Sequence, residues 1–356
     1  MTNTQLLNAI IEKLENSHIN LYHDISKVDV QKYISSLKGI DNLSSIEFDY
    51  EMMKLFALFK DAHTSYYTPW KSLDKKLKFL NNKFYVYENE KYIEIVSING
   101  KSVDEIYSKL VPLMNYETKE WLDKKIDISI NNRYIYEMLG FDIKQDLIFT
   151  TTTNEHITAK MIDNKTLQNN KVRPKAYSYQ IIDHEILYFR YRACREDANY
   201  LFAQFISDIT QEIENKNLKK YILDLRGNGG GNSEILNSFQ ALVKEKQLQG
   251  VLIIDNGVFS SARFAVARFK KEFDTPLIGE TTGGAIKSYG QCLPLSIEGK
   301  RFSASQKYFN FSNVANYDGG FRPDIYVPTT IDDINDGYDR QLEVALETLK
   351  NSNKKI

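Results

Sequence analysis

The sequence predicts a multi-module α/β protein in which a helical segment and a mixed β segment precede a layer built from βαβ units. Apolar residues recur at helical spacing near the N-terminus, short alternating runs follow, and strands alternate with helices from residue 196 onward. With 356 residues, 42% of them hydrophobic, the chain can bury more than one core. We expect three segments: residues 1–77, 78–175 and 176–356.

The first segment is predicted to be helical. LLNAIIEKL, VDVQKYISSL and FDYEMMKLFALF each carry apolar residues at helical spacing, and polar stretches separate them. The pattern ends in KDAHTSYYTPW, where aromatic residues surround His63.

The second segment is predicted to be mostly strands. Residues 78–114 show short alternating strands, an Asn99-Gly100 turn and an amphipathic helix, and residues 140–190 again show strands with turns.

The third segment is predicted to form the βαβ layer. Helices are expected at residues 196–215, 233–246 and 261–273, and strands at 220–225, 250–255 and 275–280. In open α/β sheets, the loops at the carboxyl ends of strands line the ligand-binding crevice. The loop RGNGGGN (226–232) and the loop around Phe259-Ser260-Ser261-Ala262 should therefore face the same cleft.

The glycine-rich loop has several interpretations. Glycines permit positive φ and let backbone N–H groups point at an anion, as in an oxyanion hole or a phosphate nest. A phosphate-binding loop would need Lys and then Ser or Thr after the glycines, where Asn232-Ser233 stands, and the dinucleotide pattern G-x-G-x-x-G is also missing. The simpler alternative is a tight turn with Asn232 or Ser233 as the N-cap of the next helix.

The second loop places a serine between a strand and a helix. Such a serine projects from a sharp turn beside helix N–H groups, which suits a nucleophile, although an N-cap is the commoner role there.

Charge and cysteine content restrict the partners. Lys plus Arg total 46 and Asp plus Glu total 47, so no global field favours nucleic acid or an anionic membrane. Cys194 and Cys292 are too few for a disulfide scaffold, and no Cys/His cluster has metal-ligand spacing. Polar residues interrupt any apolar signal region at the N-terminus, and no later run is long enough to cross a membrane. We expect a soluble, cytoplasmic protein without metal or cofactor, with a trimmed leader as the alternative.

Four stretches resemble, in order over residues 221–327, the signatures of the C-terminal processing (tail-specific) serine peptidases, whose wider family includes the tricorn core protease. They are ILDLRGNGGG, VLIIDNGVFSSA, LIGETTGG and GGFRPDIYV. Upstream, LFALFKDAHTSY is similar to the family's D-[G/A]-H-[T/S] segment, and IVSINGKSVDEI to a PDZ segment. The resemblance implies a crotonase- or ClpP-like catalytic core, a PDZ-like remnant before it, and a peptide or protein substrate.

The resemblance also implies roles for individual residues. In the family the nucleophile lies twenty residues before the Glu of the G-E-x-T motif, which is Glu280 here, so Ser260 would be the nucleophile. The N–H of Ser261 would form one half of the oxyanion hole, and Gly229 or Gly230 the other half.

Two bases are candidates. Members that use Lys carry it five residues after that Glu, where Ala285 stands here, and Lys287 lies two residues further on. The tricorn-like branch uses an N-terminal His and an acidic residue near the final G-x-x-P-D motif, which implies His63 as base and Asp318 as its partner. A histidine, with an ordinary pKa of about 6.5, can accept the serine proton at neutral pH. The remaining histidines are assigned no role: His18, His23, His156 and His184.

Two functions follow from these residues. The first is a serine peptidase, a hydrolase that cleaves extended or unfolded polypeptide through an acyl-enzyme. The second is a peptide- or ligand-binding protein that has lost catalysis on the same fold, an alternative that the missing Lys favours.

Overall fold

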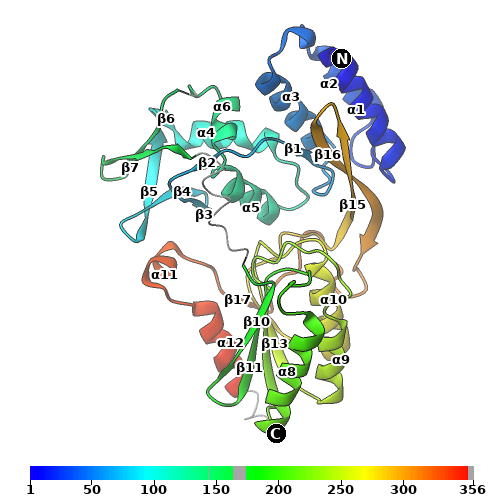
Figure 1. The fold of residues 1–356 in the computed structure, drawn as a ribbon, viewed down its shortest axis with the longest axis vertical. Coiled ribbons are helices and arrows are strands. Elements are labelled where there is room, and N and C mark those ends of the chain that lie inside the picture. The colour runs from blue at the N-terminus through cyan, green and yellow to red at the C-terminus, as the bar shows by residue number, and fades with distance from the viewer. Residues whose placement is uncertain (143, 163–173, 352–356) are drawn as a thin grey trace. The chain divides into compact units, whose positions relative to one another are not determined.

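The structure is a computed structural model that describes residues 1–142, 144–162 and 174–351 (Figure 1). The chain divides into two compact units, which we call unit 1 (residues 1–171 and 288–309) and unit 2 (residues 172–287 and 310–356). Nearly all of the first two predicted segments lies in unit 1. Residues 288–309, expected in the third segment, also pack in unit 1. Part of the predicted strand region, at residues 143 and 163–173, lies outside the described residues.

The N-terminal part of unit 1 is helical, as predicted. Its helices are α1 (Asn3–Ser17), α2 (Lys27–Ser36), the 3-10 turn η1 (Ile40–Asn42) and α3 (Ser45–Leu58). Thr2 and Ser44 begin α1 and α3 with capping boxes, because each hydroxyl accepts the third amide of the helix while a Gln or Glu side chain bonds back to the cap. The apolar sides of these helices form one core with Phe302 and Ala304.

Phe302 and Ala304 belong to a long hairpin that runs beside α1 in Figure 1. The hairpin consists of β15 (Lys287–Ile297) and β16 (Lys300–Asn310), and β1 (Tyr66–Tyr67) pairs antiparallel with β16. The segment that carries His63 is therefore tied to this hairpin directly through β1.

The rest of unit 1 is an antiparallel sheet covered by helices. The sheet order is β3-β4-β5-β7-β8, with β6 paired to β5. The strands are β3 (Leu77–Leu80), β4 (Lys83–Glu88), β5 (Lys91–Ile98), β6 (Lys101–Ser102), β7 (Leu147–Thr151) and β8 (His156–Ala159), and a separate pair joins β2 (Ser72–Leu73) to β9 (Met161–Ile162). The helices are α4 (Val103–Leu110), η2 (Val111–Leu113), α5 (Lys119–Ser129) and α6 (Arg133–Met138). Asn99 and Gly100 have positive φ, so the predicted turn is present.

Unit 2 contains the predicted βαβ layer, and the mixed α/β class is confirmed. The strands lie in the order β10-β11-β12-β13-β14-β17. The last five strands of this order run parallel to one another, and β10 pairs antiparallel with β11. They are β10 (Tyr177–Ile182), β11 (Ile186–Tyr191), β12 (Lys220–Asp224), β13 (Gln249–Ile254), β14 (Leu277–Gly279) and β17 (Ile325–Tyr326). The helices are α8 (Phe202–Asn215), α9 (Asn237–Glu245), α10 (Ala262–Phe273), α11 (Ile331–Asp336) and α12 (Arg340–Asn351).

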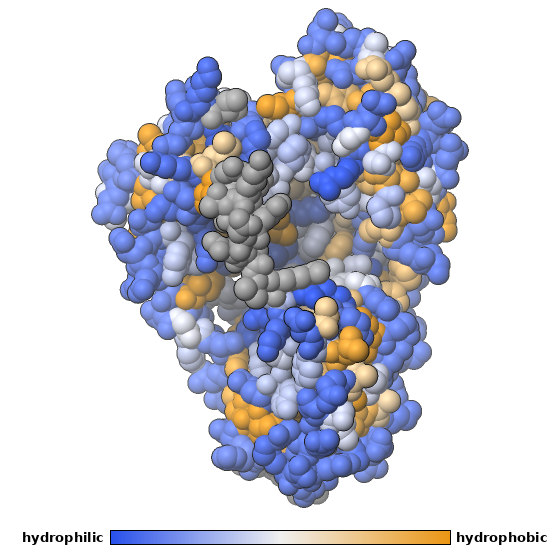
Figure 2. Space-filling model, viewed as in Figure 1, coloured by the Kyte–Doolittle hydropathy of each residue, from blue (hydrophilic) through white to orange (hydrophobic). Residues whose placement is uncertain are grey.

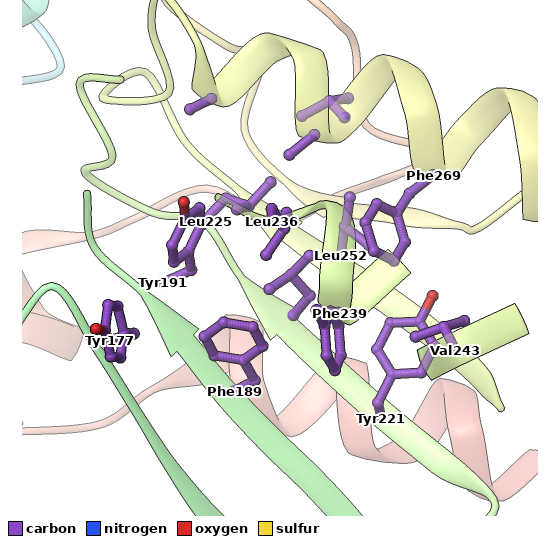
Figure 3. Close-up of a cluster of buried hydrophobic side chains, with 14 of the residues drawn as sticks. Tyr177, Phe189, Tyr191, Tyr221, Leu225, Leu236, Phe239, Val243, Leu252 and Phe269 are labelled. Carbon is purple, nitrogen blue, oxygen red and sulfur yellow. The ribbon is translucent and has the colours of Figure 1, made fainter. Parts of the chain in front are cut away.

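Two apolar cores enclose the sheet of unit 2. Helices α8, α9 and α10 cover one face with an aromatic-rich cluster, in which the ring of Phe189 meets the ring of Phe239 edge-on at 4.8 Å (Figure 3). Helix α12 covers the other face with Ala345 and Leu349. Every residue of β12 is buried, as expected for a parallel strand covered on both faces.

Two helices begin later than predicted. Helix α8 begins at Phe202, because the Glu196 carboxylate accepts the N–H of Phe202 (2.8 Å) and residues 196–201 form a loop. Helix α9 begins at Asn237, after a turn in which Asn232 Oδ1 accepts the N–H of Glu234 (3.0 Å). The suggestion that Asn232 or Ser233 caps this helix is therefore wrong.

The face of the molecule seen in Figure 2 is mostly hydrophilic, with scattered apolar patches. Within residues 1–142, 144–162 and 174–351, every helix is too short or too polar to span a bilayer.

Candidate active site

The two loops predicted to lie together do so in unit 2. One follows β12 and the other follows β13, which is its parallel neighbour. The N–H of Phe259 donates to the carbonyl oxygen of Asn228 (3.0 Å), and the hydroxyl of Ser261 donates to the carbonyl oxygen of Gly231 (2.5 Å). The glycine-rich loop therefore packs directly against the loop that carries Ser260.

The contacts explain why two of the glycines have no side chain. Gly230 has φ 101°, and a Cβ there would lie 2.6 Å from the Cβ of Ser260 and 2.8 Å from the backbone N of Ser261. Gly231 has φ 134°, and a Cβ there would lie 2.1 Å from the carbonyl oxygen of Cys194. Any side chain at these positions would therefore force the two loops, or the loop and Cys194, apart.

Ser260 has a strained backbone. Its φ of 50° lies in the left-handed region, where residues other than glycine are uncommon and cost of the order of 1–3 kcal/mol. The contact with Gly230 and a hydrogen bond from Arg263 Nε to the Ser260 carbonyl oxygen (3.1 Å) hold this conformation. A serine held on a sharp turn between a strand and a helix is the arrangement of a nucleophile elbow.

Ser261 differs from Ser260 in its backbone conformation and in the hydrogen bonding of its hydroxyl. Its φ of −62° is ordinary, it is the first residue before α10, and its hydroxyl is already bonded to Gly231. Of the two serines, Ser260 has the strained backbone and Ser261 a structural hydroxyl.

The backbone N–H groups of the two loops differ in whether they already have a hydrogen-bond acceptor. The N–H of Gly230 donates to Asn228 Oδ1 (2.9 Å). The N–H groups of Gly229 and Ser261 have no acceptor among the described residues. Because an oxyanion hole needs unused donors, Gly229 fits that role better than Gly230.

Asp318 and Lys287, the predicted acidic partner and the alternative base in unit 2, lie in surroundings that suit these roles poorly. The side chain of Asp318 is 96% exposed and lies 3.4 Å from the ammonium group of Lys287, which is also exposed. Ala285, at the position of the family Lys, is buried, and its carbonyl oxygen accepts a hydrogen bond from Arg263. Glu280 accepts a hydrogen bond from the Thr329 hydroxyl (2.8 Å).

His63 is buried in unit 1, in the loop after α3. Its backbone is held on both sides: its N–H donates to Asp61 Oδ1 (2.8 Å), and its carbonyl oxygen accepts from Ser303 Oγ (2.7 Å). The side-chain amide of Asn115 donates to the carbonyl oxygens of Asp61 (3.0 Å) and Thr64 (2.8 Å). The loop is therefore fixed by buried hydrogen bonds rather than by packing alone.

His18, to which the sequence assigned no role, belongs to this network. Its Nε2 lies 2.8 Å from Asp61 Oδ2, and both side chains are fully buried. Its Nδ1 accepts the N–H of Asn20 (2.9 Å), so the proton is on Nε2 and the ring is a neutral donor to Asp61. No motif surrounds His18 at the end of α1, and only the tertiary contact reveals it.

Asp61 is held as a carboxylate. Burial on its own would raise the pKa of this group, but hydrogen bonds from His18, Ser305 and Thr64 and the proximity of His63 lower the pKa below its ordinary value. A fixed negative charge thus lies two residues from His63 and in the same unit.

Asp61, His63 and Glu117 each offer one ligand atom, and these atoms lie within 4.8 Å of one another. The oxygens of Asp61 already accept hydrogen bonds from His18, from Thr64 and from the His63 backbone. A metal ion would have to displace these donors, so we assign no metal to this group.

Comparisons with known proteins give a partial family match and a shared fold. Residues 185–248 match the model of Peptidase family S41, and this range includes the glycine-rich loop and ends before Ser260. No curated protein matches the sequence.

Solved structures share the fold over nearly the whole chain. The crystal structure of mature CPAF matches with a TM-score of 0.69 at 11% identity, over 99% of this chain and 98% of that chain. A putative peptidase from Parabacteroides merdae matches with a TM-score of 0.52 at 14% identity, over 98% and 97% of the two chains. The tricorn protease matches with a TM-score of 0.50 at 14% identity, over 98% of this chain and 36% of that chain.

The fold and the sequence match define the class of the protein as a serine peptidase, a hydrolase. Residues 185–248 match peptidase family S41 and the fold is shared with solved peptidases, so the predicted relationship to the C-terminal processing peptidases is confirmed.

Proposed function

We propose that the protein is an endopeptidase that cleaves extended or unfolded polypeptide through an acyl-enzyme on Ser260, with His63 as the general base. The observation that carries the proposal is the strained Ser260, whose φ of 50° is enforced beside the unused N–H groups of Gly229 and Ser261. Backbone strain is concentrated at functional sites, and unused N–H donors beside a nucleophile can stabilise the oxyanion that forms in acyl transfer.

The reaction follows from these groups. His63 takes the proton of the Ser260 hydroxyl as the oxygen attacks the carbonyl carbon of the substrate. The N–H groups of Ser261 and Gly229 stabilise the negative oxygen of the tetrahedral intermediate. The protonated imidazole then gives its proton to the leaving amine, and water, activated in the same way, hydrolyses the ester.

In this proposal Asp61 orients His63 and stabilises the imidazolium. Its carboxylate is buried, charged and bonded to the His63 backbone, whereas the side chain of Asp318 is 96% exposed and pairs with Lys287. The partner role that the sequence suggested for Asp318 is therefore reassigned to Asp61.

Ala285 at the family's Lys position supports a second candidate, a protein that binds peptides without cleaving them. Hydrolysis of casein by purified variants distinguishes the two. We expect Ser260→Ala to lose at least about a thousandfold in kcat and Ser261→Ala to keep much of its activity, because position 261 contributes a backbone N–H. Wild-type protein without activity would favour the binding function, and an inactive Ser261→Ala beside an active Ser260→Ala would show that the nucleophile is Ser261.

The same assay separates the two bases. His63→Ala should be nearly inactive and Lys287→Ala active, since Lys287 is solvated and paired with an exposed carboxylate. The reverse ranking would assign the base to Lys287.

A further inference from the structure

A cavity of about 470 Å³ lies within unit 1, in the size range of about 300–1,000 Å³ that is typical of small-ligand sites. Its lining is mainly apolar and includes residues of α5 and of the segment after β1. At its rim, Tyr67, Trp70 and Ile128 are 46%, 43% and 45% exposed. Large apolar side chains gathered around one opening mark a surface that a ligand would cover.

The charged residues in the lining are all cations. Within the described residues, the lining includes Lys125 and Arg301 and contains no Asp or Glu. Arg301 stands on β16 directly opposite Tyr67. The only hydrogen bond of the Lys125 ammonium group to a described residue goes to Asn115 Oδ1, so further N–H groups can meet a ligand.

The surroundings of Lys125 favour an anionic ligand. Burial lowers the pKa of Lys125 to about 8, although the carboxylates of Asp61 and Glu117 and the thiol of Cys292 act in the opposite direction. A poorly solvated ammonium group gains more from a direct anionic partner than an exposed one does.

We propose that this cavity binds an amphipathic carboxylate, with an aromatic or branched apolar body between Trp70 and Trp121 and the carboxylate at Lys125 and Arg301. Two sources have this chemistry: a free organic acid and the C-terminal residue of a peptide. The site borders the His63 loop, because Asn115 accepts from Lys125 and donates to the carbonyl oxygens of Asp61 and Thr64. Binding here does not depend on the proposed peptidase mechanism.

The chain supplies its own reporter for this site. It contains two tryptophans, Trp70 and Trp121, and both line the cavity. Intrinsic fluorescence should therefore change saturably when 4-phenylbutyrate is added to the full chain carrying Ser260→Ala, which removes turnover from the readout. Its uncharged analogue 4-phenylbutanamide should bind at least tenfold more weakly.

A second pair of probes identifies the source. The peptide acetyl-Gly-Gly-Phe, with a free carboxylate, is compared with 4-phenylbutyrate. If the peptide binds at least tenfold more tightly, the site is assigned to peptide C-termini. If the peptide binds more weakly, the site is assigned to a free acid. If neither acid gives a saturable change, or if both amides bind as well as the acids, the proposal is overturned.

Variants link the signal to the two cations. Lys125→Met and Arg301→Gln should each weaken 4-phenylbutyrate binding, the former by at least tenfold, with an unchanged circular dichroism spectrum. Lys124→Met is the matched control, since Lys124 is the neighbouring residue on α5, pairs with Asp127 and does not line the cavity. Unchanged affinity in both folded variants, or an equal loss in Lys124→Met, would contradict the site.

Discussion

Ser260 and Asp61 show how single residues are forced into unusual states by their neighbours. Ser260 keeps a positive φ because Gly230 packs against its Cβ, and Asp61 stays charged in a buried position because His18 and Thr64 donate to it. The choice of Ser260 as the nucleophile follows from its distance to Glu280, as the family resemblance implies, and stays a prediction. The role of His18 could not be predicted, because its partner is 43 residues away and no local pattern marks it.

The Asp61 carboxylate should make the free energy of unfolding depend on pH in the acidic range. A carboxyl group whose pKa is lowered by folding stabilises the protein above its unfolded pKa of about 3.9, and this contribution is lost as the pH falls toward the folded value. At pH 7, Asp61→Asn should lower the free energy of unfolding by about 2–3 kcal/mol, and the difference from wild type should shrink below about pH 4.

Urea unfolding between pH 7 and pH 3 measures this difference. Asp318→Asn is the control, because its 96% exposed side chain should change stability by less than about 0.5 kcal/mol. A difference between wild type and Asp61→Asn that stays constant, or grows, as the pH falls would contradict the charged, hydrogen-bonded state of Asp61.

At the scale of elements, the site in unit 2 is formed by two loops at the carboxyl ends of the parallel neighbours β12 and β13. Alternating strands and helices predicted this arrangement, because such loops meet at one edge of a parallel sheet. The start of α9 was not predictable in the same way, since Asn232 bonds to Glu234 within a turn instead of capping the helix. The sequence also had no assignment for α5 and α6, whose place is set by tertiary packing.

Adjacent glycines of this loop should respond differently to the same substitution. Gly230→Ala places a Cβ against Ser260 and Ser261 at a positive φ, so turnover should fall at least about a hundredfold, similar to the loss of one oxyanion donor. Gly229→Ala has open space around its Cβ and an ordinary φ, and it keeps the backbone N–H, so its kcat should stay within about threefold of wild type.

Peptide hydrolysis by both variants, with circular dichroism as the check of folding, makes the comparison. Equal losses in folded Gly229→Ala and Gly230→Ala would show that the contact with Ser260 is not what requires glycine at position 230.

At the scale of the whole molecule, the two units have separate apolar cores. The helical start, the middle β region and the βαβ layer could be predicted, since each depends on local periodicity. The placement of residues 288–309 could not, because Phe302 and Ala304 complete a core formed by helices near the N-terminus. Such long-range pairing leaves no trace in local sequence patterns.

Separate cores predict that the units lose stability separately. Leu252→Ala in unit 2 should destabilise that unit by about 2–5 kcal/mol, and the transition followed by far-UV circular dichroism should move or split. The transition followed by tryptophan fluorescence should stay in place, because Trp70 and Trp121 both lie in unit 1.

Ile126→Ala is the matched variant in unit 1, on the same helix as Trp121, and should move the fluorescence transition. If Leu252→Ala shifts the fluorescence transition as far as the circular dichroism transition, the two units unfold as one.

The most direct test of the central claim is the site of covalent labelling by a fluorophosphonate probe, located by mass spectrometry of the digested protein. The account predicts one adduct on Ser260, which forms in Ser261→Ala and is lost in Ser260→Ala and strongly slowed in His63→Ala. An adduct on another residue, or labelling of wild type and Ser260→Ala to the same extent, would contradict it.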